Sequence, residues 1–165
     1  MMLGVGSLTV VYSYENRCKN PGEGIEGKPS ARNVLGGAQA GAVVDKLPVD
    51  IEDRVIPSSS NDEISIRIVR PQGNTDTLPV VVYFYGGWVL GDKDTHDRLI
   101  REIANGAKAA VIFVNYTPSP EARYPVAIEQ AYAATKWVAE NSTAINVDSS
   151  RLAVVGDSPR IFYNS

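Results

Sequence analysis

Three short apolar runs, separated by segments with helical periodicity, limit the folds open to this chain more than any other feature. They span residues 78–84, 109–114 and 152–155, and none shows the alternation of apolar and polar residues found in strands with one face in water. Strands that are apolar on both faces are typical of parallel sheets whose two sides are covered by helices. We therefore expect these runs to form buried parallel strands.

The two segments between the runs have the periodicity of amphipathic helices. Residues 94–107 place four apolar side chains on one face: Leu99, Ile100, Ile103 and Ala104. Residues 125–141 begin with a proline, which is favourable in the first turn of a helix, and carry a second stripe: Ile128, Ala131, Thr135 and Val138. Strand, helix, strand, helix, strand is the order of a doubly wound α/β fold.

The segment before this core predicts a different kind of sheet. Residues 50–70 alternate apolar and polar side chains, as half-buried antiparallel strands do, and residues 58–62 predict the turn between two such strands. Residues 1–30 are poorly patterned, and we expect a weakly ordered N-terminal arm there. A short helix is expected over 31–47, so that the folded domain is predicted to span residues 31–165.

Charge and cysteine content exclude several classes of protein. Sixteen basic and nineteen acidic residues give a net charge of −3, without a cluster of Lys or Arg that could neutralise a row of phosphates, so we expect no nucleic-acid partner. Cys18 is the single cysteine, which predicts neither a disulfide framework nor a metal cluster. The apolar residues 1–14 are too short and too polar to span a bilayer and lack the features of a signal peptide, so we expect a cytoplasmic protein.

Two stretches follow apolar runs at the sheet edge where open α/β folds bind their ligands. They are YFYGGWVLGD at 83–92 and VVGDSPR at 154–160, and NYTPSPEARYP lies between them at 115–125. In this order and spacing the three stretches resemble the hormone-sensitive-lipase-like branch of the α/β-hydrolase family. The resemblance runs from about residue 31 to Ser158. It implies a partial α/β-hydrolase fold with an antiparallel start and then a doubly wound parallel sheet, lacking the C-terminal half.

This resemblance implies the chemistry of a carboxylesterase or lipase. Ser158 matches the nucleophile of the family's G-x-S-x-G elbow, and Gly86 and Gly87 match the loop whose N–H groups form the oxyanion hole. The implied partner is a small-molecule ester, and no cofactor is implied, because acyl transfer to a serine needs none. In the family, an acid and then a histidine follow the serine and complete the triad.

The chain departs from the family pattern around both motifs. It has Tyr-Gly-Gly-Trp at 85–88, where the family has His-Gly-Gly-Gly-Trp, one residue longer. After Ser158 comes Pro159, which has no N–H to offer an oxyanion, and Arg160 replaces the second glycine of the elbow. Loss of one oxyanion donor typically costs about 100- to 1000-fold in turnover, so these departures predict a strongly impaired enzyme.

The base of a serine triad is also missing from its expected place. His96 is the single histidine, and it precedes Ser158, against the family's order of serine, acid and histidine. We therefore expect His96 on the surface of the helix predicted at 94–107. Asp157 is an ordinary feature of this branch's elbow, not the triad acid. Only seven residues follow Ser158 in the sequence, too few for a triad acid and base.

Two hypotheses remain open. The chain is either an ester hydrolase of impaired activity or a non-catalytic binding or interaction module derived from such an enzyme. A strand at residues 151–157 without a further neighbour would leave an apolar edge with unpaired N–H and C=O groups. We therefore expect self-association through this strand.

Overall fold

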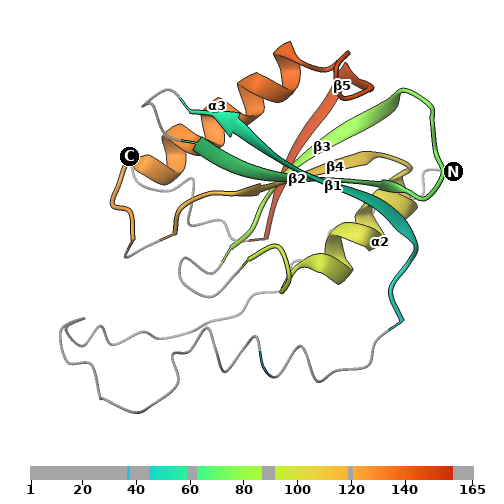
Figure 1. Ribbon diagram of the computed structural model, residues 1–165, viewed down its shortest axis with the longest axis horizontal. Helices are drawn as coiled ribbons and strands as arrows, with labels where there is room; N and C mark the ends of the chain where they lie inside the picture. The colour runs from blue at the N-terminus through green and yellow to red at the C-terminus, as the bar shows by residue number, and fades with distance from the viewer. Residues whose placement is uncertain (1–36, 38–44, 59–62, 87–91, 119–120, 158–165) are drawn as a thin grey trace, which may run out of the picture.

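The computed structural model describes residues 37, 45–58, 63–86, 92–118 and 121–157. They form five strands and two helices, which Figure 1 labels along the chain: β1 (Val49–Pro57), β2 (Glu63–Pro71), β3 (Leu78–Phe84), α2 (Asp97–Ala107), β4 (Ala110–Asn115), α3 (Val126–Glu140) and β5 (Val147–Gly156).

The strands form one sheet in the order β1-β2-β4-β3-β5. Strand β2 pairs with β1 and with β4 in antiparallel fashion, whereas β3 pairs with β4 and with β5 in parallel fashion. The predicted antiparallel start followed by a parallel core is confirmed. Strand β4 lies between β2 and β3, and β5 lies on the far side of β3. Because β3, β4 and β5 are parallel, the helices that connect them must pass over the faces of the sheet.

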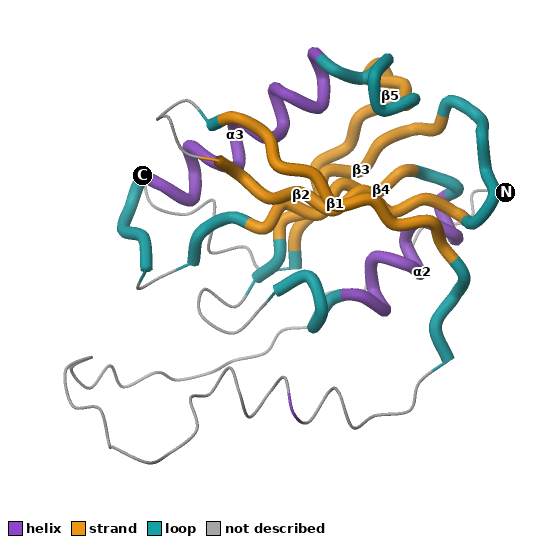
Figure 2. Tube along the Cα trace, viewed as in Figure 1, coloured by secondary structure: helices purple, strands orange, loops and turns teal. Residues whose placement is uncertain are grey.

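Helices α2 and α3 lie on opposite faces of the sheet, as Figures 1 and 2 show, so the doubly wound arrangement is confirmed. Helix α2 buries Ile100 and Ala104 against the sheet, and α3 buries Ala134 and Val138. Leu99 was predicted on the buried stripe of α2 but is 42% exposed. The buried stripe of α2 is therefore narrower than the positions of its apolar residues indicate.

The core lies around the two central strands of the sheet. Every residue of β3 except Pro79 is buried, and so is every residue of β4 except Asn115. These two strands are buried on both faces, as their uninterrupted apolar runs predicted. Burial of each large aliphatic side chain contributes roughly 1.5–3 kcal/mol, so β3 and β4 fix the position of the segments that follow them.

Strand β5 differs from the prediction made for residues 152–155. Residues 152–155 are as apolar as β3 and β4, yet the side chain of Val154 is 48% exposed and that of Val155 is 39% exposed. The reason is its place in the sheet, because β5 pairs on one side only, with β3, among the described strands. The prediction of burial on both faces is wrong here, whereas the predicted apolar edge is present.

The predicted N-terminal arm at 1–30 lies outside the described residues, as do most of the helix predicted at 31–47 and most of the turn at 58–62. The domain boundary near residue 30 therefore stays a prediction. Of the helices in the described part of the chain, none is long and apolar enough to cross a membrane.

Candidate functional site

The two motif stretches meet at the carboxyl ends of β3 and β5. These strands are paired to their last residues, with Phe84 opposite Gly156. A Cβ atom built on Gly156 would lie 3.0 Å from the carbonyl oxygen of Phe84, which is tighter than nine in ten real Cβ contacts. Glycine therefore lets β5 approach β3 this closely without a shift of the backbone, and the approach brings the next residues, Tyr85, Gly86 and Asp157, together.

Asp157 joins three separate segments through its carboxylate. One oxygen, Oδ1, accepts a hydrogen bond from the backbone N–H of Gly86, which follows β3. The other, Oδ2, lies 2.9 Å from Nε2 of His96, which immediately precedes α2. Residues that are 71 and 61 positions apart in the sequence thus share one carboxylate.

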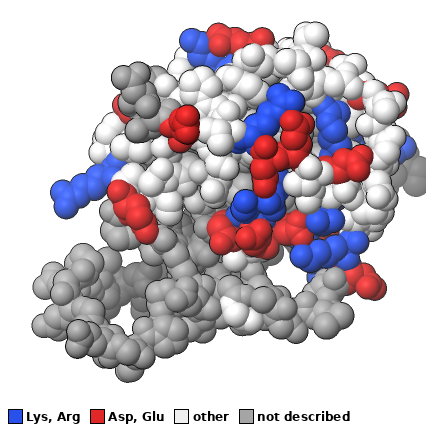
Figure 3. All heavy atoms as spheres, viewed as in Figure 1, with Lys and Arg blue, Asp and Glu red and all other residues white. Residues whose placement is uncertain are grey.

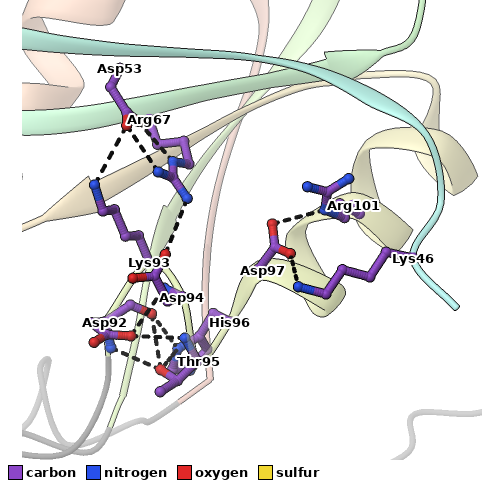
Figure 4. Close-up of polar contacts among 10 residues, drawn as sticks. All are labelled: Lys46, Asp53, Arg67, Asp92, Lys93, Asp94, Thr95, His96, Asp97 and Arg101. Atoms are coloured by element: carbon purple, nitrogen blue, oxygen red, sulfur yellow. Dashed lines mark hydrogen bonds and ion pairs between the residues drawn. The ribbon is translucent and has the colours of Figure 1, made fainter. Parts of the chain in front are cut away.

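His96 reaches Asp157 because a tight turn holds the segment before α2, which Figure 4 shows in close-up. The Asp92 carboxylate accepts hydrogen bonds from the backbone N–H groups of Asp94 and Thr95, at 3.0 and 2.8 Å. The Thr95 hydroxyl oxygen in turn accepts the N–H of Asp92 at 2.9 Å. Short polar side chains that bond the nearby backbone in this way favour turns over helix, which explains why α2 begins at Asp97 and not at 94.

The expectation that His96 lies on a helix surface is wrong. Its side chain is only 15% exposed. Its ring lies against three aromatic rings in or directly after the central strands, with centroid distances of 6.1 Å to Tyr83, 5.8 Å to Tyr85 and 6.0 Å to Phe113. Local periodicity could not reveal this position, because the partner that holds the imidazole, Asp157, follows β5 and lies 61 positions further along the chain.

Both nitrogens of the His96 ring face acceptors. Nε2 faces the Asp157 carboxylate, and Nδ1 lies 3.0 Å from the carbonyl oxygen of Asp92. Burial by itself lowers the pKa of His96, but the hydrogen bonds and negative charges of Asp157 and Asp92 outweigh it and raise the pKa above its ordinary value. For Asp157 the effects have the opposite sign. Burial raises its pKa, but the hydrogen bonds from His96 and the Gly86 N–H, together with the His96 charge, outweigh burial and lower the pKa below its ordinary value.

Two tyrosines hold the carboxyl ends of β3 and β4 side by side. The Tyr116 hydroxyl donates to the carbonyl of Tyr85 at 2.7 Å, and the Tyr85 hydroxyl donates to the carbonyl of Tyr116 at 3.1 Å. Their rings are stacked with centroids 4.4 Å apart. Burial, together with nearby charge, raises the pKa of Tyr116. The pair fixes the backbone just before Gly86, and neither tyrosine was singled out from the sequence as a site residue.

Ion pairs fasten the loop before α2 to the antiparallel strands, as Figure 4 shows. Arg67 of β2 makes two hydrogen bonds to the carboxylate of Asp53 on β1, at 2.7 and 2.9 Å. Lys93 lies 3.5 Å from the same carboxylate, and Asp94 lies 3.5 Å from Arg67. The hydrogen bonds to Arg67 lead the effects that lower the pKa of Asp53 to about 2. Acidic and basic side chains are intermixed over this face of the molecule (Figure 3).

Several residues predicted for the site lie outside the described part of the chain. They are Gly87, Trp88, Ser158, Pro159 and Arg160. The nearest described residues are Gly86 and Asp157, which the structure brings together. Over the described residues, no three side chains of His, Cys, Asp or Glu are grouped so that they could hold a metal ion.

Comparisons with known proteins place the chain in a family. A family model described as the alpha/beta hydrolase fold matches residues 80–159. A thermostable esterase from Pseudomonas putida is similar in structure, with a TM-score of 0.73 and 50% sequence identity over 76% of this chain and 40% of that chain. The chain belongs to the α/β-hydrolase family.

The relatives of this chain within the α/β-hydrolase family include carboxylesterases. They confirm the predicted hormone-sensitive-lipase-like branch. Carboxylesterase NlhH of Mycobacterium tuberculosis is 45% identical over 109 residues, which make up 66% of this chain and 34% of the relative. Esterase LipI of the same organism is 54% identical over 119 residues, 68% of this chain and 37% of the relative. The chain thus spans about a third of the length of these relatives.

Proposed function

We propose that the protein is a carboxylic ester hydrolase in which Ser158 is the nucleophile. The observation that carries this proposal is the hydrogen bond between Asp157 and the N–H of Gly86. It brings the residue before the serine into contact with the first residue of the proposed oxyanion loop, Gly86-Gly87. The similarity to carboxylesterases supports the same chemistry.

The proposed reaction is acyl transfer through the serine. The Ser158 hydroxyl oxygen attacks the ester carbonyl carbon and loses its proton to a base, and the carbonyl oxygen becomes an oxyanion that N–H groups stabilise. The C–O bond to the alcohol then breaks, and the alcohol leaves with a proton. Water attacks the acyl-serine in the second half and releases the carboxylic acid.

Three features lead us to propose that this chain turns over slowly. The single histidine of the sequence, His96, has both ring nitrogens next to other acceptors, so it is not free to take the Ser158 proton. The N–H of Gly86 already donates to Asp157, so it can serve an oxyanion only after that bond opens. Pro159 has no N–H at all.

A short-chain p-nitrophenyl ester tests the proposal directly. We expect the purified chain to release p-nitrophenol at a low rate, and a Ser158→Ala variant to release less. An alkylphosphonate that mimics the tetrahedral intermediate should label the wild-type chain once, on Ser158, as read by mass spectrometry. Equal rates for both proteins together with absence of the phosphonate label would remove Ser158 from the reaction.

A second candidate function is a non-catalytic interaction module that associates with itself. The exposed apolar side chains of β5, Val154 and Val155, at the open edge of the sheet favour this candidate. An exposed strand edge offers unpaired N–H and C=O groups to a second strand. We also propose a cytoplasmic location, which cell fractionation tests.

A further inference from the structure

The hydrogen bonds made by the Asp157 carboxylate, which we call the Asp157 bridge, have no role in the proposed hydrolysis. The bridge links the segment after β3, through the Gly86 N–H, to the segment before α2, through His96 Nε2. Asp157 itself follows β5, so three elements meet on one side chain. The bridge stands on contacts among described residues and does not depend on whether Ser158 reacts.

The acceptors around His96 determine which protons its ring carries. A carbonyl oxygen can only accept, so the 3.0 Å contact between Nδ1 and the Asp92 carbonyl calls for a proton on Nδ1. The 2.9 Å contact between Nε2 and the Asp157 carboxylate calls for a proton on Nε2. Neutral imidazole has one N–H, and only the imidazolium form supplies both protons.

One neighbour offers the neutral ring an alternative. The Thr95 hydroxyl lies 3.0 Å from Nδ1 and could donate to it, which would leave the Nε2 proton for Asp157. The same hydroxyl lies 3.0 Å from the Asp92 carbonyl and has a single proton. If it donated to Nδ1, the Asp92 carbonyl would lose that proton and would also face the Nδ1 lone pair. The charged ring satisfies more of these groups than the neutral ring does.

The groups that face His96 from each side favour the positive charge. The Asp157 carboxylate faces it from the end of β5, and the Asp92 backbone carbonyl faces it from the preceding turn. The negative charge of the Asp92 side chain also acts on the ring. Tyr83 of β3 and Tyr85, which directly follows β3, contribute rings whose hydroxyls are neutral near pH 7. Phe113 of β4 carries no charge. Among these neighbours both charged groups are acidic.

We propose that Asp157 is a positioning residue that couples the Gly86 amide to a positively charged His96, so that the backbone at Gly86 responds when His96 loses its proton. The lost charge weakens the hold of Nε2 on Oδ2. The carboxylate can then rotate and shift its bond to the Gly86 N–H. Asp157 thus acts on the proposed oxyanion loop through its hydrogen bonds, without touching a substrate.

The direction of the pH dependence follows from the pKa shifts of two groups, the His96 imidazole and the Asp157 carboxyl. The pKa of His96 is raised from 6.5, so its contribution is complete below pH 6.5 and is lost as the pH rises through the raised value. The pKa of Asp157 is lowered from 3.8, so its contribution is complete above pH 3.8 and is lost as the pH falls through the lowered value. The bridge is therefore complete between pH 3.8 and 6.5.

Nuclear magnetic resonance tests the proposal on the full chain, because the sequence has a single histidine and its ring signals need no selection. We expect the wild-type ring to titrate with a midpoint above pH 6.5, and the assigned Gly86 amide to shift with the same midpoint. In Asp157→Asn the His96 midpoint should fall by about one pH unit or more, since an adjacent opposite charge has an effect of that size. The Gly86 amide should then no longer follow it.

Two further variants complete the test. Asp148→Asn removes another carboxylate of β5, one that bonds Ser150 and Arg151, and should leave the His96 midpoint unchanged. His96→Gln keeps a side chain that can donate to Asp157 but has no charge to lose, and should abolish the pH step at Gly86. An unchanged His96 midpoint in Asp157→Asn overturns the proposal. If that variant does not fold, a Gly86 step that persists in His96→Gln overturns it equally.

Discussion

At the scale of single residues, the site depends on the small size of Gly156. Gly156 has no Cβ, and this permits β5 to pair with β3 up to Phe84, whose carbonyl oxygen would lie 3.0 Å from such an atom. The neighbour is backbone, which cannot turn away as a flexible side chain could. The position of Asp157 next to Gly86 follows from this close approach.

A methyl group at this position should therefore destabilise the fold. We expect Gly156→Ala to lower the free energy of unfolding by about 1–3 kcal/mol, the usual cost of forcing extra volume into a packed site. Urea unfolding followed by circular dichroism measures it. Gly106→Ala is the matched control, because nothing lies within 4 Å of an added Cβ in that helix. There we expect a gain of about 0.5–1 kcal/mol, and a similar effect at both positions would contradict the packing argument.

The Tyr116 hydroxyl should also matter for stability. Tyr116→Phe removes the 2.7 Å hydrogen bond to the buried Tyr85 carbonyl, and the loss of one hydrogen bond typically costs about 0.5–1.5 kcal/mol. Tyr132→Phe removes the same atom from a side chain that is 69% exposed, and we expect a change within about 0.5 kcal/mol. Thermal and urea unfolding of both variants gives the comparison. Equal losses would mean that the tyrosine pair does not hold the strand ends.

At the scale of elements, the loop before α2 is attached at two points. Its own turn, built on Asp92 and Thr95, sets the start of the helix. The ion pairs of Lys93 and Asp94 with Asp53 and Arg67 attach it to β1 and β2. His96 directly follows this anchored turn and directly precedes α2, so its ring is delivered to Asp157 by a segment that is held on both sides.

The pair of Asp53 and Arg67 should give this attachment a pH dependence. The pKa of Asp53 is lowered from 3.8 to about 2, so its stabilisation is complete above pH 3.8 and disappears as the pH falls through about 2. Asp53 is 45% exposed, so we expect Asp53→Asn to cost only about 0.5–1 kcal/mol at pH 6. Urea unfolding at pH 6 and pH 2 should show that most of the difference is lost at the lower pH. Exposed Asp45 provides the control, and a loss in Asp45→Asn at pH 6 as large as that of Asp53→Asn would contradict this assignment.

Much of the element structure could be predicted from the sequence, and the exceptions share a cause. The runs in β3 and β4 were predicted correctly because uninterrupted apolar letters report burial on both faces. The same letters in β5 were misleading, because burial also depends on which elements cover a strand. His96 was misplaced since its decisive partner is 61 positions away. Motif spacing brought Gly86 and the elbow to one edge, but gave no sign that Asp157 would hold the Gly86 N–H.

At the scale of the whole molecule, the two edges of the sheet differ in kind. The edge strand β1 carries consecutive charged residues, Glu52, Asp53 and Arg54, which discourage pairing with another chain. The last five residues of β5, from Leu152 to Gly156, carry no charge. Only one edge of the described sheet is therefore open to association.

Size-exclusion chromatography with light scattering tests this asymmetry. We expect the wild-type chain to associate as its concentration rises, and Val154→Lys to shift it toward the monomer, because a charge on an edge strand opposes pairing. Val55→Lys is the control on β1, where Val55 is 62% exposed, and should leave association unchanged. A monodisperse monomer at every concentration would remove β5 as a contact surface.

The uncharged end of β5 also limits what an assembly could become. When two copies join through the same strand, each uses the edge that the other needs, and a twofold axis relates them. The outer edges of such a pair are both β1, with their charged residues facing water. Growth therefore stops at two copies, and the chain is expected to form a finite particle in place of a fibre.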